Sequence, residues 1–166
     1  MNILVLCTGN SARSILGEVL VNDLGAGDLR AYSAGSNPAG KVNPGAIAKL
    51  LGEGHSVDGL ESKSWDRFTG SDAEPFQIVI TVCDNAAGES CPVWNGSPVT
   101  VHWGIPDPAA AADEDLAAAF DKAYAQMKVR VEALVQLPLM HLDNESTREA
   151  LQAIHELALS REQADD

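Results

Sequence analysis

The start of the chain combines a short apolar strand, a loop of small residues and a helix. Residues 3–6 are all apolar, which predicts a fully buried strand, and a helical repeat of apolar residues follows at Ile15, Leu16, Val19, Leu20 and Leu24. The residues between the two are Cys7, Thr8, Gly9, Asn10, Ser11, Ala12, Arg13 and Ser14. A strand that leads into a helix in this way starts a βαβ unit, so this segment predicts an α/β fold with helices packed on a parallel sheet.

The remainder of the chain continues the alternation of strands and helices. Further strands are predicted at 29–33, 76–82 and 100–103, and helices at 44–51 and 113–135. This order predicts right-handed crossovers and a single-domain, doubly wound, four-stranded parallel sheet flanked by helices. Ligands bind at the carboxyl ends of the strands in such sheets, so we expect functional residues directly after the strands.

Two helix starts carry recognisable caps. Asn43 followed by proline predicts the beginning of the helix at 44–51. Ser146 and Glu149 fit a capping box, which predicts an additional C-terminal helix to Ser160. We expect this last helix to pack on the domain, and a partner-binding or dimerising helix is the alternative.

Length, charge and cysteine content limit the classes of function. The 166 residues, 45% hydrophobic and 21% charged, suffice for one domain with a real core. Lys+Arg 11 against Asp+Glu 24 gives a net charge of −13, which argues against nucleic acid and anionic membranes as partners. The apolar run at 3–6 is too short for a signal peptide or a membrane span. We therefore expect a cytoplasmic protein with reactive thiols.

The loop at 7–14 has the residue types of an oxyanion site. Gly9 adapts its backbone, and the N–H groups of the loop and of the following helix end can converge on one anion. The planar fork of Arg13 binds a tetrahedral oxyanion through two hydrogen bonds. Such a field lowers the pKa of Cys7 and makes it a nucleophile, supported by the Ser14 hydroxyl. The alternative is a buried core cysteine beside a surface arginine, and the strand–loop–helix pattern favours the oxyanion site.

These residues resemble the C-x5-R-S loop of the low-molecular-weight tyrosine phosphatase superfamily. The sequence Cys-Thr-Gly-Asn-Ser-x-Arg-Ser resembles that of its arsenate reductase branch. Further motifs resemble that branch in the same order: Tyr32-Ser33-Ala34-Gly35, Asn43-Pro44-Gly45-Ala46-Ile47, Val82-Cys83, His102-Trp103-Gly104 and Asp107-Pro108-Ala109. Many members carry a second cysteine where this chain has Ala12. The resemblance implies a phosphatase-like arsenate reductase domain at 1–138, followed by a C-terminal helical extension at 139–166.

Two cysteines outside the loop distinguish the two activities of this superfamily. Cys83 and Cys91 lie eight positions apart, with small and polar residues between them. A phosphatase needs one cysteine, whereas arsenate reduction takes two electrons from thiols and leaves a disulfide. The resemblance implies that Cys83 resolves a thiol–arsenate intermediate and that Cys91 takes the disulfide to the surface. An external thiol is the alternative for this last step.

The resemblance also implies the remaining roles. Cys7 attacks arsenic, the backbone amides of Thr8, Gly9, Asn10, Ser11, Ala12 and Arg13 bind arsenate, and Asp107 protonates the leaving hydroxide. Ala109 and Ala110 stand where phosphatases of this fold carry an aromatic wall, which favours a small inorganic ion.

Three positions resemble those that some members of the superfamily place near a potassium ion. They are Asn10, Glu18 and Ser33, whereas Trp65 takes the place of a further acidic position. The four histidines lack ligand spacing, and no C-x2-C pair occurs. We therefore predict no metal site.

These features together predict a cytoplasmic arsenate reductase that releases arsenite and holds no bound cofactor. Its electrons come from an external thiol reductant, either thioredoxin or glutathione with glutaredoxin. The first alternative is a low-molecular-weight protein tyrosine phosphatase that forms a phosphocysteine on Cys7. The second is a non-catalytic redox sensor or partner-binding protein that works through its C-terminal helix.

Overall fold

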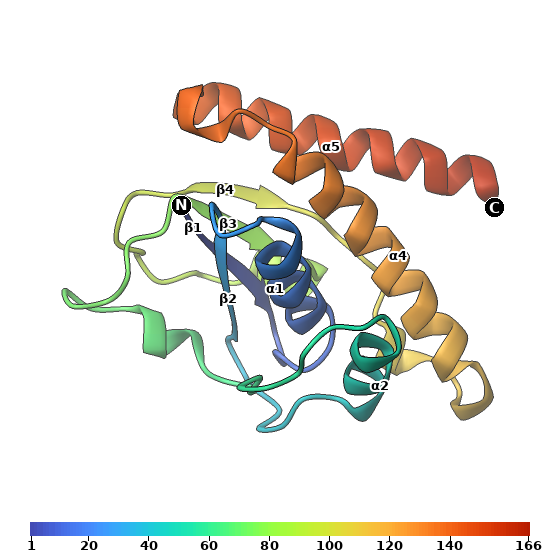
Figure 1. The fold of residues 1–166 in the computed structure, drawn as a ribbon. Helices are drawn as coiled ribbons and strands as arrows, with labels where there is room; N and C mark the ends of the chain where they lie inside the picture. The colour runs from blue at the N-terminus through green and yellow to red at the C-terminus, as the bar shows by residue number, and fades with distance from the viewer.

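The computed structural model describes all 166 residues, which form one sheet and its covering helices. The four strands are parallel and lie in the order β2-β1-β3-β4 (Figure 1). Their bounds are β1 (Asn2–Cys7), β2 (Arg30–Gly35), β3 (Ile78–Thr81) and β4 (Val99–His102). The predicted fold class is confirmed.

Helices follow every strand. The α-helices are α1 (Arg13–Leu24), α2 (Pro44–Gly52), α3 (Asp84–Gly88), α4 (Leu116–Val135) and α5 (Asn144–Asp165). Four short 3-10 helices complete the chain: η1 (Trp65–Phe68), η2 (Pro108–Ala110), η3 (Asp113–Asp115) and η4 (Leu139–His141). The long helix predicted at 113–135 therefore begins as the 3-10 turn η3 and becomes α-helical at α4.

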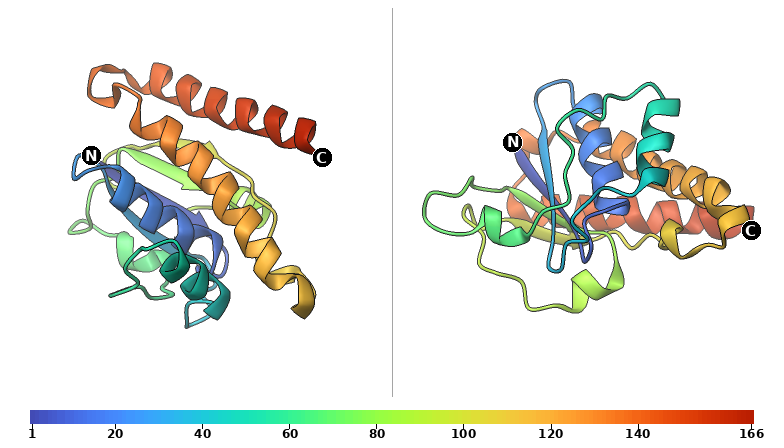
Figure 2. Two further views of the ribbon diagram at one scale, coloured as in Figure 1. Left: turned by 45° about the vertical axis from the view of Figure 1, so that its right-hand side comes forward. Right: turned by 90° about the horizontal axis from the view of Figure 1, so that it is seen from below.

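The two faces of the sheet are covered differently. Alternate residues of β1 point to opposite faces, so Ile3 and Val5 join the large core while Leu4 and Leu6 join a smaller, aromatic cluster. Figure 2 shows α1, α2 and α4 together on one face, and η1 and α3 on the other. The aromatic cluster on this second face contains Phe68, Phe76 and Trp94, with Tyr32 and Trp65 packed against it.

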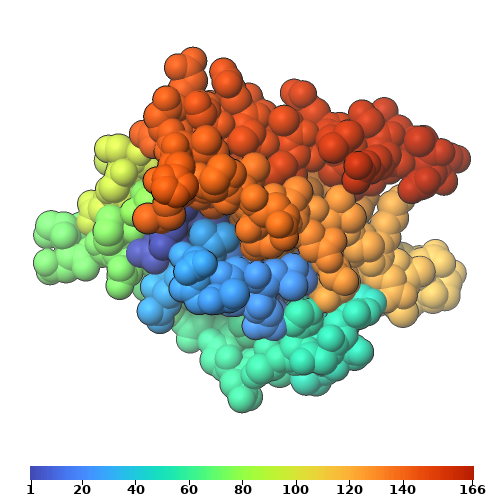
Figure 3. Space-filling model, turned by 45° about the horizontal axis from the view of Figure 1, so that its top comes forward, coloured from blue at the N-terminus to red at the C-terminus, as the bar shows by residue number.

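Helix α5 packs against α4 and β4, and Figure 3 shows it as a layer beside α4. The indole Nε1–H of Trp103 donates to the Leu151 carbonyl at 3.0 Å. Arg130, which is fully buried, donates to both carboxylate oxygens of Glu162 at 2.6 and 3.3 Å. These contacts fix α5 on the domain.

The predicted start of this helix is wrong. The cap of α5 is Asp143, whose Oδ1 accepts the N–H of Ser146 at 2.7 Å, so Ser146 lies within the first turn. The helix also continues to Asp165, beyond the predicted end at Ser160. Because Asp143 and Ser146 are both good capping residues, the sequence pattern fits either start.

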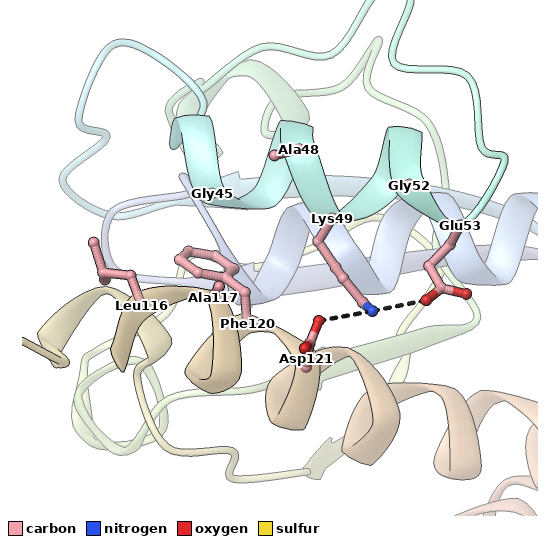
Figure 4. Close-up of a pocket in the computed structure, with 9 residues that line it drawn as sticks. All are labelled: Gly45, Ala48, Lys49, Gly52, Glu53, Leu116, Ala117, Phe120 and Asp121. Carbon is pink, nitrogen blue, oxygen red and sulfur yellow. Dashed lines mark hydrogen bonds and ion pairs between the residues drawn. The ribbon is translucent and has the colours of Figure 1, made fainter. Parts of the chain in front are cut away.

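Helix α2 begins as predicted and packs closely on α4. The Asn43 side chain accepts the N–H of Gly45 at 2.8 Å. A β-carbon on Gly45 would collide with the ring of Phe120, so only glycine permits this approach. A cavity of about 410 Å³ lies between the two helices, where Lys49 pairs with Glu53 at 2.7 Å and with Asp121 at 2.9 Å (Figure 4).

Candidate functional site

The carboxyl ends of the strands meet at one edge of the sheet, and a cavity of about 210 Å³ opens there. Cys7 is the last residue of β1, Cys83 caps α3 directly after β3, and Asp107 caps η2 after β4. The residues that line the cavity are Cys7, Thr8, Gly9, Ser11, Ala12, Arg13, Cys83, Asn85, Asp107 and Ala109. The structure thus brings the predicted nucleophile, second thiol and acid together.

The backbone of the loop is arranged for an anion. None of the N–H groups of residues 8–13 donates to a backbone oxygen. The loop carbonyls instead accept from the chain behind: Asn37 N–H at Thr8 (3.0 Å), Ala39 N–H at Gly9 (2.9 Å) and Asn43 N–H at Ser11 (2.9 Å). Because the carbonyls are turned outward, the free N–H groups form the concave side, which suits an oxyanion.

Arg13 adds a charged donor to this cavity. Its Nη1 donates to the Ile105 carbonyl at 3.0 Å, which fixes the guanidinium. Its Nε is buried without a hydrogen-bond partner. Because a buried N–H donor normally has a partner, the unpaired Nε points to an oxyanion as the missing acceptor.

Asn10 supports the loop from within. It is fully buried with a φ of 44°, a left-handed conformation that asparagine tolerates better than most residues. Its Oδ1 accepts the backbone N–H of Lys63 at 2.9 Å, and its Nδ2 donates to the Ser14 Oγ at 2.8 Å. Ser14 is therefore oriented by Asn10, at the buried start of α1.

Cys7 and Cys83 are two thiols that line the same cavity. Both are buried and free, and a hydrogen bond from the Cys7 thiol lowers the pKa of Cys83 to about 5. The Thr8 hydroxyl, 3.6 Å from the Cys83 Sγ, and the Ala86 N–H, 3.4 Å away, act in the same direction. The same hydrogen bond and burial raise the pKa of Cys7, whereas Arg13 lowers it. The expected lowering of the Cys7 pKa is therefore wrong for the free protein, and the lowered pKa belongs to Cys83 instead.

The third cysteine lies outside the cavity. Cys91 is exposed, and partial burial of its sulfur together with the Glu89 carboxylate raises its pKa. Glu89 itself accepts a hydrogen bond from the Thr8 hydroxyl at 3.3 Å, which ties the segment at 83–91 to the loop. Its second carboxylate oxygen is buried without a partner.

Asp107 stands at the mouth of the cavity. Its Oδ1 accepts the N–H of Ala109 at 3.0 Å, and its Oδ2 lies 3.8 Å from the Arg13 Nη2. The side chain is 44% exposed, so it can exchange a proton with water. With Ala109 on the cavity wall, this side presents no aromatic surface.

Two of the three positions that resemble a potassium site, Glu18 and Ser33, lie beside a lysine ammonium instead. The Lys63 Nζ lies 3.5 Å from the Ser33 Oγ, 3.8 Å from the Glu18 Oε1 and 3.2 Å from the Glu61 carbonyl. A potassium ion does not fit here because the ammonium already supplies the positive charge among these oxygens. Trp65, which takes the place of a further acidic position, packs its ring against Trp94, 6.2 Å between centroids.

Sequence reasoning missed three other residues. Asn85 lines the cavity, and Glu89 contacts Thr8. His102 connects β4 with the start of α3, since its ring nitrogens lie 2.8 Å from the Thr81 Oγ1 and 3.0 Å from the Asp84 Oδ1.

No group of three or more His, Cys, Asp and Glu side chains is placed to hold a metal ion. No helix has both the length and the apolar character that crossing a membrane requires.

Comparison with known proteins agrees with this geometry. Residues 2–149 match the family described as low molecular weight phosphotyrosine protein phosphatase, and the chain belongs to this family. Arsenate reductase from Halalkalibacterium halodurans is 32% identical over 133 residues, which are 79% of this chain and 92% of that protein. Arsenate reductase from Bacillus subtilis is 33% identical over 106 residues, 64% of this chain and 73% of that protein.

Solved structures show the same fold. An arsenate reductase from Archaeoglobus fulgidus superposes with a TM-score of 0.64 at 28% identity, covering 81% of this chain and 99% of that one. A low molecular weight phosphotyrosine phosphatase from Vibrio cholerae superposes with a TM-score of 0.63 at 17% identity, covering 81% of this chain and 93% of that one. The predicted superfamily is confirmed, and the sequence relatives named above are arsenate reductases.

Proposed function

We propose that the protein is an arsenate reductase that uses its own thiols as the immediate electron donor. The observation that carries this proposal is that two free, buried thiols, Cys7 and Cys83, line one cavity beside an oxyanion loop. Phosphoester hydrolysis has no use for a second buried thiol in the same cavity as the nucleophile. Arsenate reduction requires one, because two electrons must pass from sulfur to arsenic.

The reaction begins with arsenate in the loop, bound by the free N–H groups and by Arg13. The thiol proton of Cys7 passes along the hydrogen bond to Cys83, and the Cys7 thiolate attacks arsenic. Asp107 supplies the proton with which one arsenate oxygen leaves as water. The product of this step is a Cys7–arsenic thioester with arsenic still in its oxidised state.

The second step is a thiol exchange. Cys83 releases the proton it received to solvent, and its thiolate attacks the Cys7 sulfur and breaks the sulfur–arsenic bond. The electron pair of that bond stays on arsenic, which leaves as arsenite, and a Cys7–Cys83 disulfide remains. The lowered pKa of Cys83 supports this role because the thiolate is the attacking species.

The last step regenerates the enzyme. Cys91 attacks the Cys83 sulfur, which frees Cys7 and moves the disulfide to Cys83 and Cys91. The exposure of Cys91 supports this transfer because a cytoplasmic thiol reductant, thioredoxin or glutathione with glutaredoxin, can reach it. On this scheme residues 1–138 carry out the reaction, and α5 in the extension at 139–166 stabilises the domain.

A single-turnover experiment tests the proposal. Reduced protein is mixed with excess arsenate without added thiol, and arsenite and disulfides are quantified by speciation and peptide mapping. We expect stoichiometric arsenite and a Cys83–Cys91 disulfide. Cys83→Ser should release no arsenite but keep any residual phosphatase activity. If Cys83→Ser reduces arsenate as well as the wild type does, the reductase mechanism is wrong. Arsenite only after glutathione is added would mean that an external thiol, and not Cys83, resolves the Cys7–arsenic intermediate.

A further inference from the structure

Lys63 is the one buried lysine of the chain, and the reaction above does not use it. Its side chain is 8% exposed, and that of its partner Glu18 is 12% exposed. Burial of a lysine ammonium is costly unless oxygen atoms replace its water shell. The oxygens here come from three elements: Glu18 in α1, Ser33 in β2 and the carbonyl of Glu61.

The backbone of the same residue braces the oxyanion loop. The Lys63 N–H donates to the Asn10 Oδ1 at 2.9 Å, and its carbonyl accepts the N–H of Gly35 at 2.9 Å. The neighbouring Ser62 hydroxyl donates to the Gly9 carbonyl at 3.0 Å. The segment that carries the ammonium therefore holds two consecutive loop residues from behind.

Glu18 depends on this ammonium. Its Oε1 accepts the Ser33 N–H at 3.0 Å, and Lys63 is the only cationic side chain within ion-pair distance. Burial raises the pKa of Glu18 and lowers that of Lys63, so each charge persists in the fold because of the other. Loss of the ammonium would leave a buried carboxylate beneath the loop, which favours displacement of the segment at 61–64.

We propose that the Lys63 ammonium is a built-in cation that holds Glu18 and the segment at 61–64 in place, and so keeps the oxyanion loop in its binding conformation without a bound metal cation. Lys63 is thus a positioning residue, since it acts through Asn10 and the loop backbone. This inference rests on the proposed function only in that the loop binds a tetrahedral oxyanion.

The proposal has a specific consequence for a truncated side chain. Lys63→Ala would leave a cavity lined by a carboxylate, a hydroxyl and a carbonyl oxygen, which are ligands of hard cations, and a monovalent cation would restore the single charge of the ammonium. Potassium ions should therefore restore in this variant what the ammonium provides in the wild type. Lys63→Met removes the charge but fills the space, so potassium should not restore it.

The test measures the affinity for inorganic phosphate, which binds as arsenate does but is not reduced. Calorimetric titrations compare potassium chloride with choline chloride at equal ionic strength, because choline is too large for the cavity. We expect equal affinities for the wild type in the two salts. Lys63→Ala should bind about tenfold more weakly in choline chloride, the effect of one unsatisfied buried charge, and should recover in potassium chloride. The exposed Lys41→Ala is the matched control and should behave as the wild type does.

Each outcome decides the matter. Equal phosphate affinity of Lys63→Ala and wild type in choline chloride overturns the inference, as does a weakening that potassium leaves unchanged. If Lys63→Ala does not fold in either salt, Lys63→Met, which fills the space but leaves the Glu18 carboxylate without its ammonium, replaces it. Wild-type affinity of Lys63→Met would overturn the inference, and a loss of about tenfold in both salts would support it. A wild type that binds phosphate in neither salt would overturn the oxyanion site itself.

Discussion

The two cysteine-bearing segments at the sheet edge are built in opposite ways. The loop at 7–14 leads into the 12-residue helix α1, whose first turns are buried, and its carbonyls are held by hydrogen bonds from three neighbouring positions. The segment at 83–91 leads into the five-residue helix α3, and most of its residues are exposed. Beyond the end of α3, no backbone N–H of residues 89–94 donates to another backbone group.

This difference matches what each segment must do. An oxyanion is bound best by donors that are already in place, because none of the binding free energy is then spent on ordering them. A disulfide relay instead needs a sulfur that reaches two partners in turn, and segments with few internal hydrogen bonds open at low cost. The side-chain contact between Thr8 and Glu89 joins the rigid segment to the movable one.

The largest effect should come from a substitution at Gly35, which packs behind the loop at 7–14. A β-carbon there would collide with the Thr8 carbonyl and would lie 3.0 Å from the Asn10 nitrogen. Gly35→Ala should therefore displace the loop, destabilise the fold by about 3 kcal/mol and weaken phosphate binding about 100-fold. Calorimetry and thermal unfolding measure both.

Gly52 supplies the matched control for this glycine. A β-carbon on Gly52, at the end of α2, meets nothing within 4 Å. Gly52→Ala should leave phosphate affinity unchanged and gain at most about 1 kcal/mol of stability from helix propensity. Equal behaviour of the two variants would show that close backbone packing behind the loop does not shape the oxyanion site.

The next largest effect should come from Cys91 in the segment at 83–91. Cys91→Ser should leave the first turnover intact, because arsenite departs when the Cys7–Cys83 disulfide forms. Later turnovers with thioredoxin should slow about tenfold or more, because the disulfide then stays in the buried pair. Arsenite release over time, with an initial burst of one equivalent per protein, measures this. A wild-type steady-state rate would mean that the reductant attacks the buried disulfide directly.

The sequence predicts the loop at 7–14 far better than it predicts the contacts that this loop makes with distant residues. The loop at 7–14 is local, so strand, glycine, arginine and helix start stand next to one another in the chain. Lys63 meets Asn10 across 53 positions, and Glu89 meets Thr8 across 81, and neither contact has a local signal. Parallel strands bring Cys83 to the same sheet edge, which the topology predicts, but the lowering of its pKa depends on side-chain packing.

The pH dependence of the thiol pair should be visible before any reaction. A folded-state pKa of about 5 for Cys83 lies below the ordinary value, so its thiolate is present above this pH and is lost as the pH falls through it. The ultraviolet thiolate absorbance of the reduced protein should show one step near pH 5 that is absent from Cys83→Ser. No step below pH 8 would mean that both thiols are protonated at neutral pH and that substrate itself must create the thiolate.

The smallest effect should come from the Thr8 side chain, which joins the loop at 7–14 to the segment at 83–91. Thr8→Val keeps the loop backbone and the shape of the side chain, but removes a hydroxyl 3.6 Å from the Cys83 Sγ and 3.3 Å from the Glu89 Oε1. The pKa of Cys83 should rise, because one of the groups that stabilise its thiolate is lost. Release of Glu89 should at the same time loosen the segment at 83–91.

Formation of the Cys7–Cys83 disulfide should then slow by roughly threefold, which is the value of one weak hydrogen bond. Phosphate affinity should stay within about twofold of the wild type, which is roughly the error of such titrations. Rapid quenching with peptide mapping follows the disulfide. A larger loss of phosphate affinity than of disulfide rate would show that Thr8 acts only in the loop at 7–14, and that the two segments act independently.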